Sequence, residues 1–300
     1  MIARSVTRLL GISIALMTLA AFGILLSRTL ELNGGAWSTL FADMRVAVLV
    51  THFGHIWVWR IPALASLWLA WLWSRSRPAQ AWTGWLMGLA LAAIALARSN
   101  TGHPADHGDF LIPVWIDWLH ILAAGTWVGS LFGMTLAVFP HLLRQGAHAL
   151  ADTAAVFQRL STLSGIALAV LLACGIYNVT QQLGPVSALW TSRYGITLDI
   201  KLALVLSMIL IGAHNRYWKL PRLRACAGLP GTRAWLSGWL HRHDDAQTSA
   251  SDVMRSCARA VLLEGLLGLA AIGATGVLIH QMPPADAAPM HAMQSPVQSP

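Results

Sequence analysis

The chain has 300 residues, 56% of them hydrophobic and only 11% charged, with a mean hydropathy of +0.59. Segments of about 20 apolar residues recur along the whole length, which excludes an ordinary soluble domain and predicts an all-α, polytopic bundle of transmembrane helices. The net charge of +8 lies mainly in the connections between these segments, so it indicates membrane topology and argues against nucleic acid as a partner.

Several classes of function lack their sequence signals. The three cysteines, Cys174, Cys226 and Cys257, have no C-x-x-C spacing, so neither a disulfide nor a zinc site is expected. No G-x-x-x-x-G-K-[ST] phosphate loop occurs, so we expect no ATP hydrolysis. Because no loop combines a nucleophile with a base at useful spacing, we predict that the protein is not an enzyme.

The apolar segments predict seven membrane helices. Their expected ranges in chain order are 9–26, 46–73, 81–97, 113–141, 159–182, 194–218 and 257–280. The first segment is longer than the core of a signal peptide, so we expect it to be retained. An eighth span is the alternative, and it would lie in the tryptophan-containing loop 219–252.

The basic residues predict the orientation of the helices. With the amino end in the cytoplasm, 14 of the 20 Lys and Arg residues fall on the cytoplasmic side, as the positive-inside rule requires. We therefore expect one integral membrane domain over residues 1–300, ending in a flexible periplasmic tail at 285–300.

The stretch 113–141 is expected to be the central helix. It carries Asp117 and His120 near one end, and these two side chains share a helix face because they are three residues apart. Gly125, Gly129 and Gly133 lie on a neighbouring stripe. Since small residues at this spacing let helix backbones approach closely in lipid, we expect these glycines to form a packing seam.

Histidines gather at or near the outer membrane face in this topology. They are His52, His55, His103, His107, His120 and His280. The outer tail adds residues of related chemistry, namely Met282, Met290, His291 and Met293. Imidazole suits copper and a thioether suits Cu(I) in particular. Loop histidines also occur simply as polar interface residues, so each one taken alone is weak evidence for a metal site.

His120 is the strongest of these candidates. It lies about 10 Å below the membrane surface at a rise of 1.5 Å per residue from Pro113, and a polar residue at that depth is costly and usually functional. Asp117 would hold the second nitrogen of this imidazole, or serve as a ligand itself. His52 and His55, three residues apart, would complete the site. The structural alternative is a buried hydrogen bond between helices.

Three further charges fall inside predicted membrane helices, Asp199 and Lys201 in the sixth and Glu264 in the seventh. The expected depths of Lys201 and Glu264 differ by less than about 10 Å in a core about 30 Å thick. We therefore predict an ion pair between Lys201 and Glu264 that neutralises both charges and clamps the two helices together, with an ion relay as the alternative role.

The second half of the chain carries a series of motifs in a fixed order. They are L-S-T-L-S-G-I-A-L, C-G-I-Y-N, S-R-Y-G-I-T-L-D-I-K-L-A-L, H-N-R-Y-W-K-L-P-R-L and A-R-A-V-L-L-E-G-L-L-G-L, preceded in the first half by D-W-L-H-I-L-A-A-G-T-W-V-G. Through these motifs residues 160–284 resemble the copper resistance protein D family, and the earlier motif resembles the fuller members. Ser130 departs mildly from that pattern, which has another small residue or glycine there.

The resemblance implies copper handling at the inner membrane of a Gram-negative bacterium, with uptake from the periplasm and a periplasmic copper-binding partner. Together with the histidines, it leads to the hypothesis that copper enters at a periplasmic His/Asp site and passes to the cytoplasm without ATP hydrolysis. One alternative is a b-type haem electron carrier, in which His55 and His120 would ligate the iron. The other is a copper-binding accessory protein that does not transport.

Overall fold

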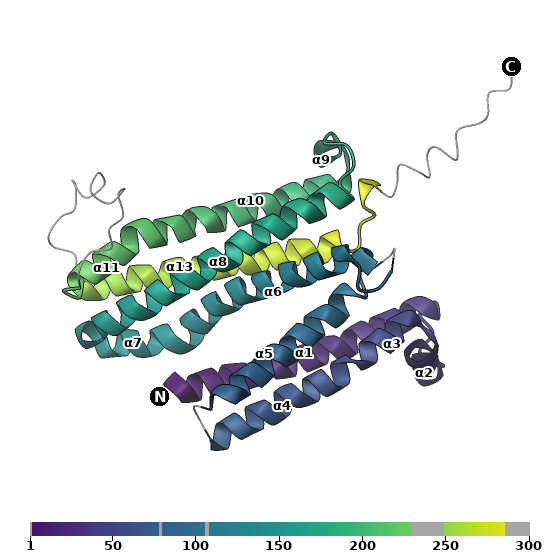
Figure 1. Cartoon of the computed structure of the whole chain (residues 1–300), viewed down its shortest axis with the longest axis horizontal. Helices are drawn as coiled ribbons and strands as arrows, with labels where there is room; N and C mark the ends of the chain where they lie inside the picture. The colour runs from purple at the N-terminus through teal and green to yellow at the C-terminus, as the bar shows by residue number, and fades with distance from the viewer. Residues whose placement is uncertain (1, 78–79, 106–107, 230–248, 286–300) are drawn as a thin grey trace. The chain divides into compact units, whose positions relative to one another are not determined.

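The computed structural model describes residues 2–77, 80–105, 108–229 and 249–285. Every regular element in these ranges is a helix, which confirms the all-α fold class. The α-helices are α1 Ile2–Leu32, α2 Leu40–Val50, α3 His52–Val58, α4 Arg60–Ser76, α5 Ala81–Ser99, α6 Ile112–Gly133, α7 Phe139–Gln145, α8 Leu150–Gln182, α9 Ala188–Thr191, α10 Arg193–His214, α11 Leu220–Cys226 and α13 Ala250–Leu278 (Figure 1). Two 3₁₀ helices, His103–Ala105 and Gly146–Ala149, and two π-helices, Met134–Val138 and Asn215–Lys219, join them.

The described residues contain six stretches that are long and apolar enough to cross a membrane. The fourth of them, Ile112–Gln182, has 71 residues and would be about 106 Å long if straight, far more than a hydrocarbon core of about 30 Å. The chain reverses within it at Gly146, whose φ of 60° and ψ of −136° end α7, so α6 and α8 are separate passages. Within the described residues the structure therefore has the seven passages expected, and most of the loop 219–252, the place of the alternative eighth span, lies outside those residues.

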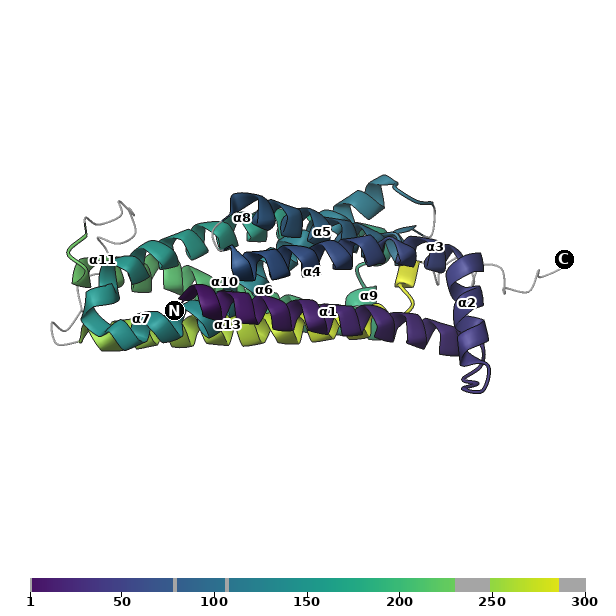
Figure 2. The ribbon, with the colours of Figure 1, turned by 90° about the horizontal axis from the view of Figure 1, so that it is seen from below.

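The second expected helix, 46–73, is broken at two places. Thr51 has an extended backbone, with ψ 147°, and its hydroxyl accepts a hydrogen bond from the Gly54 backbone amide at 3.0 Å, so it caps the start of α3. Trp59 then separates α3 from α4. Figure 2 shows that α2 turns away from the direction of α1, so the first part of this segment does not continue the passage of α4.

The chain divides into two compact units, Met1–Leu122 and Ala123–Pro300, with the boundary inside α6. The core of the first unit is formed by α1, α4 and α5, through Ile14, Ala21, Leu64, Leu67 and Ala90. Two tryptophan indoles connect α3 and α4 to α1: the Trp57 N–H of α3 donates to the Ala21 carbonyl at 3.0 Å, and the Trp71 N–H of α4 donates to the Thr7 carbonyl at 2.7 Å. Each indole thereby keeps its N–H satisfied away from water.

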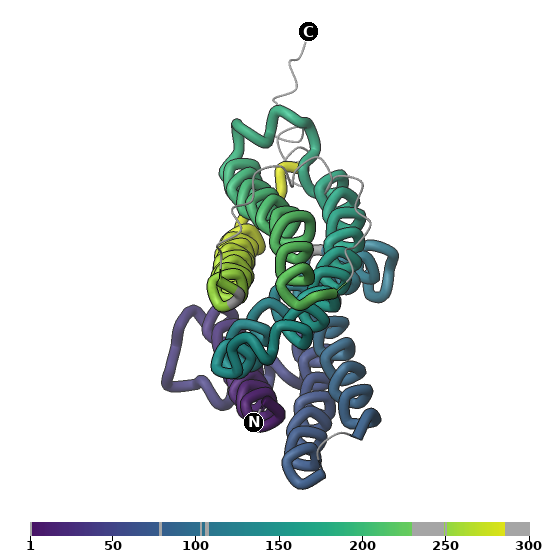
Figure 3. Tube along the Cα trace, turned by 90° about the vertical axis from the view of Figure 1, so that its left-hand side faces the viewer, coloured from purple at the N-terminus to yellow at the C-terminus, as the bar shows by residue number. Residues whose placement is uncertain are grey.

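The second unit is a bundle of α6, α8, α10 and α13, closed at one end by α7 and α11 (Figures 1 and 3). Its core includes Leu131, Phe139, Phe157, Met208 and Val261, all nearly inaccessible to solvent. These large side chains come from all four long helices and from α7, so the unit buries one continuous apolar core.

α6 and α13 can approach each other closely because α13 has a glycine, Gly268, at the contact. The predicted glycine seam on α6 is not at this contact. A Cβ atom on Gly268 would lie 2.8 Å from Val128 Cγ2 and 3.0 Å from Met208 Cε. A Cβ on Gly125, Gly129 or Gly133 would meet nothing within 4 Å. The predicted seam is therefore wrong, because the glycine that permits contact lies on the partner helix.

Replacing Gly268 by alanine should lower the stability of the second unit. The added methyl group has to displace Val128 and Met208, and overpacking of this kind typically costs about 1–3 kcal/mol. Thermal unfolding of the purified protein in detergent measures the effect. Gly276→Ala on the same helix, where a Cβ meets nothing within 4 Å, is the matched control; equal melting temperatures for the two variants would contradict the packing argument.

Each unit contains the same local corner. Thr51-x-x-Gly54 begins α3 and Ser192-x-x-Gly195 begins α10; in both, the hydroxyl caps the helix by accepting from the glycine N–H, at 3.0 and 2.9 Å. In both, the glycine lies directly against the backbone of the preceding short helix, α2 or α9, where a Cβ would fall well inside 3.0 Å of main-chain atoms. A basic residue follows the cap by nine positions, Arg60 or Lys201. The corner is therefore a repeated structural motif that changes the direction of the chain at the start of a membrane helix.

Candidate functional site

His52 forms the best-defined polar contact among the predicted ligands. Its Nε2 lies 2.9 Å from Oδ1 and 2.8 Å from Oδ2 of Asp109, although the two residues are 57 positions apart in the chain. Both side chains remain accessible, at 59% and 36% exposed. A carboxylate that holds one imidazole nitrogen orients the ring and makes its other nitrogen a better metal ligand, so His52 Nδ1 is placed for that role.

Asp109 is not among the ligands predicted from the sequence. Nothing in its spacing relates it to His52, because the contact depends on how α3 and the segment before α6 come together. The segment is held there by Asn100, whose side-chain carbonyl accepts from the Phe110 amide at 3.1 Å, and by the stacking of Trp59 on Phe110 at 6.1 Å between ring centroids. Phe110 has φ 57°, which makes the sharp bend before α6.

His55 is exposed one turn further along α3, and its Nε2 lies 2.9 Å from the Leu49 carbonyl oxygen. A carbonyl can only accept a hydrogen bond, so Nε2 carries the proton and donates. The nitrogen of His55 that remains available for a metal in this tautomer is Nδ1.

A cavity of about 330 Å³ lies beside His52 in the first unit. Its polar lining consists of Arg28, Glu31, Thr51, His52, Asn100 and Thr101. Arg28 Nη1 and Glu31 Oε2 form an ion pair at 3.0 Å. Arg60, only 3% exposed, donates from Nη2 to the Thr101 hydroxyl at 3.4 Å beneath this cavity. The imidazole therefore borders a small polar vestibule.

Asp117 and His120 lie on α6, and both side chains are half-buried. His120 is eight residues from the start of α6 at Ile112, which corresponds to about 12 Å along the helix axis. The other predicted ligands are less informative: His103 lies on the 3₁₀ helix His103–Ala105, His107 lies outside the described residues, and His280 is exposed just after α13 in the second unit. Met290, His291 and Met293 also lie outside the described residues.

Within the described ranges, no group of three His, Cys, Asp or Glu side chains has the geometry to hold a metal ion. The structure thus brings together His52 and Asp109 and places Asp117 and His120 on one half-buried helix face. The full set of predicted ligands remains a prediction.

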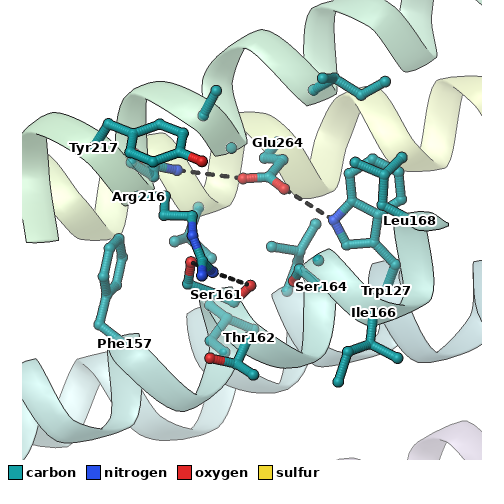
Figure 4. Close-up of a pocket in the computed structure, with 18 of the residues that line it drawn as sticks. Trp127, Phe157, Ser161, Thr162, Ser164, Ile166, Leu168, Arg216, Tyr217 and Glu264 are labelled. Atoms are coloured by element: carbon teal, nitrogen blue, oxygen red, sulfur yellow. Dashed lines mark hydrogen bonds between the residues drawn. The ribbon is translucent and has the colours of Figure 1, made fainter. Parts of the chain in front are cut away.

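The second unit contains a larger cavity, of about 530 Å³, lined by residues of α6, α8, α10, the π-helix Asn215–Lys219 and α13. Glu264 is on its wall and is only 3% exposed. Its Oε1 accepts a hydrogen bond from Trp127 Nε1 at 2.9 Å, and its Oε2 accepts one from Asn215 Nδ2 at 3.3 Å (Figure 4). Fourteen residues separate Glu264 from each end of α13, so it lies at mid-helix.

The π-helix explains how Asn215 reaches the carboxylate. Pro221 has no N–H group, so the carbonyl four residues earlier loses its α-helical partner and the turn before the proline widens. The neighbouring Arg216 points across to α8, where Nη1 donates to the Ser161 carbonyl at 3.2 Å and to its hydroxyl at 3.1 Å (Figure 4). The bulge therefore places an amide and a guanidinium at the cavity.

The predicted ion pair between Lys201 and Glu264 is wrong. The Glu264 carboxylate lies beside Gly212, where a Cβ would be 3.4 Å from Oε1. Gly212 is eleven residues along α10 from Lys201, which is about 16 Å of helix and beyond the reach of a lysine side chain. The estimate from helix ends failed because these ends do not mark the membrane surfaces. The passage of α10 continues to Cys226, over 34 residues, and α13 has 29 residues, so both are longer than the roughly 20 residues that span a bilayer.

Two family models match the chain. The one described as "Copper resistance protein D-like, N-terminal domain" matches residues 1–113, and the one described as "Copper resistance protein D" matches residues 154–278. Together they account for most of the sequence, and the second coincides with the region in which the motifs were recognised. No solved structure matches the chain.

Three curated relatives are similar at low identity. They are "Copper resistance protein D" of Pseudomonas syringae pv. tomato, 28% identical over 71% of this chain and 67% of the relative; "Copper transport protein CutJ" of Bacillus subtilis, 26% identical over 69% and 38%; and "Inner membrane protein YebZ" of Escherichia coli, 28% identical over 64% of each. The match thus spans under two fifths of the Bacillus protein and about two thirds of the other two. From the two family models and the bundle of apolar helices, the chain belongs to the copper resistance protein D family and is a multi-pass, copper-handling protein of the inner membrane.

Proposed function

We propose that the protein carries copper across the inner membrane from the periplasm to the cytoplasm without hydrolysing ATP. Copper is received from a periplasmic copper-binding protein at the first unit and passes inward along α6. His52, His55, Asp117 and His120 are the ligands assigned to this path, with His103, His107 and His280 contributing at the outer face.

The observation that carries this proposal is the contact between His52 and Asp109. The carboxylate fixes the imidazole through Nε2 at 2.8 and 2.9 Å, and the ring stays accessible from outside. An exposed, oriented imidazole beside a polar cavity is suited to receiving a metal ion from another protein. The names of the Pseudomonas and Bacillus relatives, copper resistance and copper transport, support copper as that metal.

The haem alternative has less support. A bis-histidine haem requires one nitrogen from each imidazole and a flat, enclosed site for the porphyrin. His55 is exposed and donates from Nε2 to the Leu49 carbonyl, so only Nδ1 is left for an iron ion. Purified protein without a Soret band would agree with copper handling; a strong Soret band would favour the haem carrier.

The carboxylate of Asp109 is expected to strengthen copper binding through His52. Asp109→Asn keeps the shape of the side chain but removes the charge, and loss of such a supporting partner typically weakens metal affinity about tenfold or more. Copper titration of the purified protein measures this. His148→Ala, which removes an exposed histidine of the 3₁₀ helix in the second unit, is the control and should leave the affinity unchanged.

Transport itself is tested in proteoliposomes that contain the purified full-length chain. External Cu(I) or Cu(II) is added with no nucleotide present, and copper accumulation inside is followed. Wild-type protein should accumulate copper, while His52→Ala should slow accumulation at low external copper. If copper binds tightly but never crosses the membrane, the protein is an accessory copper-binding subunit and the transport proposal is wrong.

A further inference from the structure

We propose that the Glu264 cavity of the second unit is a proton-exchange site, in which the Glu264 carboxylate takes up and releases one proton. The link between this exchange and copper movement rests on the proposed transport function. The exchange itself rests only on the cavity and the groups that line it.

The buried Glu264 carboxylate has no charged partner among its hydrogen-bond donors. Glu264 is 3% exposed in the middle of a membrane helix, where an uncompensated carboxylate is strongly disfavoured. Its two hydrogen-bond donors, Trp127 and Asn215, are neutral. The two donors therefore cannot neutralise the negative charge of the Glu264 carboxylate, and a positive charge has to come from another group.

The other titratable groups that line the cavity do not supply this cation. They are Arg216 and Tyr217, both from the π-helix, whereas α6, α8 and α10 contribute only neutral residues to the lining. Arg216 donates to Ser161 on α8, and Lys201 lies about 16 Å away along the helix. Since no side chain in the described part of the chain forms an ion pair with Glu264, a proton or a bound ion is needed to neutralise the carboxylate by direct contact.

The Glu264 cavity is lined by hard ligand atoms and not by the soft ones that copper prefers. No cysteine, methionine or histidine is among the lining residues of this cavity, so it lacks the soft ligands that Cu(I) prefers. Its polar side-chain atoms are oxygens and nitrogens, and Figure 4 shows the Arg216 guanidinium beside Ser161. The residues that carry these atoms are Trp127, Ser161, Thr162, Ser164, Asn215, Arg216, Tyr217 and Glu264. This set suits a hard monovalent cation, and a proton needs only one of these groups.

The Asn215 side chain can form a hydrogen bond with either the ionised or the protonated Glu264 carboxyl group. Its Nδ2 donates to Glu264 Oε2, as suits a carboxylate, while its Oδ1 is buried without a hydrogen-bond partner in a residue only 5% exposed. When Glu264 is protonated, the carboxyl O–H needs an acceptor, and rotation of the amide presents Oδ1 to it. Ser164 Oγ, also buried without a partner on the same cavity, is a second acceptor or donor.

The step balances without any other reactant. On release, the O–H bond of the Glu264 carboxyl group breaks, the proton leaves through the cavity and the electron pair stays on the oxygen. On uptake the same bond forms again. No atom changes its oxidation state, so neither an oxidant nor a reductant is involved.

The exchange is tested by infrared spectroscopy of the purified full-length protein in sodium-free buffer across a pH range. We expect a protonated-carboxyl band that grows as the pH falls, disappears in Glu264→Gln and persists in Asp252→Asn, an exposed carboxylate of the same helix. Asn215→Ala should move its midpoint. No titrating band attributable to Glu264 would overturn the proposal, and a band removed by sodium at constant pH would replace the proton with a sodium ion.

The coupling is tested separately by copper flux into proteoliposomes with and without a pH gradient. A gradient should change the wild-type flux, and the ratio of the two fluxes should fall to one in Glu264→Gln, whose amide keeps partners at Trp127 and Asn215. A Glu264→Gln variant that still responds to the gradient would overturn the coupling. If the wild-type protein moves no copper at all, the transport proposal fails while the infrared result still decides whether Glu264 exchanges a proton.

Discussion

Replacing His120 by alanine is expected to reduce copper uptake at least about tenfold, the lower limit for losing a group that supports a metal site. The side chain lies about 12 Å along α6 from Ile112, the end that the positive-inside rule places outside, and apart from Asp117 the helix carries no other charged or histidine side chain. A polar residue at such a depth is costly to retain and is usually functional. Copper accumulation and copper sensitivity of cells that express the protein measure the effect.

The controls for this experiment separate chemistry from folding. His148→Ala removes a histidine from an exposed position of the second unit and should leave uptake unchanged. Asp117→Asn should give an intermediate loss if Asp117 supports the imidazole, and a loss as large as that of His120→Ala if it is itself a ligand. Unchanged uptake by a well-expressed His120→Ala variant would show that copper does not pass this residue.

Gly54→Ala and Gly195→Ala are expected to be the most destabilising single-methyl substitutions in the described residues. At either position the added Cβ would fall on backbone atoms of the preceding helix, the carbonyl of Ala47 or of Ala188. Main-chain atoms cannot move aside as the end of a flexible side chain can, so the cost should reach or exceed about 3 kcal/mol, the upper end of ordinary overpacking.

Thermal unfolding in detergent tests this expectation, with one matched control in each unit. Gly23→Ala in α1 and Gly273→Ala in α13 add the same methyl group where nothing lies within 4 Å, and alanine favours a helix over glycine by about 1 kcal/mol. Both controls should melt at or above the wild-type temperature.

Gly54→Ala should also weaken copper binding, because the corner that begins with Thr51 carries His52 and His55. A Gly54→Ala protein with wild-type melting and binding would contradict the close approach of α3 to α2.

Copper remains the expected cargo, and the two units divide the chemistry in these proposals. All the proposed copper ligands except His280 lie in the first unit, whereas His280 and the oxygen-lined cavity around Glu264 lie in the second. Reagents that affect one should leave the other intact, so the copper-binding and proton-exchange measurements can be interpreted independently.

The sequence by itself determined the fold class, the approximate positions of the seven membrane passages in the described residues and the resemblance to the family. Length and apolar composition require helices in lipid, since a spanning segment must satisfy its own backbone hydrogen bonds. Helix ends were less well predicted: α8 begins at Leu150 and not at 159, and α1 runs from Ile2 to Leu32. Polar residues near the membrane boundary continue a helix as readily as they end it, so hydropathy places the middle of a span better than its ends.

Tertiary structure alone decided which polar groups meet. His52 contacts Asp109 because two segments 57 residues apart converge, and Glu264 bonds Trp127 and Asn215, while Lys201 lies too far along α10 to pair with it. Helix periodicity gives the face and approximate depth of a side chain, but not the rotation and axial offset of the helix opposite. Those depend on close packing, as at Gly268, and on local departures from the α-helix, as at Pro221. The same limit explains why the glycines of α6 were predicted to form a packing seam, although the glycine that permits the contact is on α13.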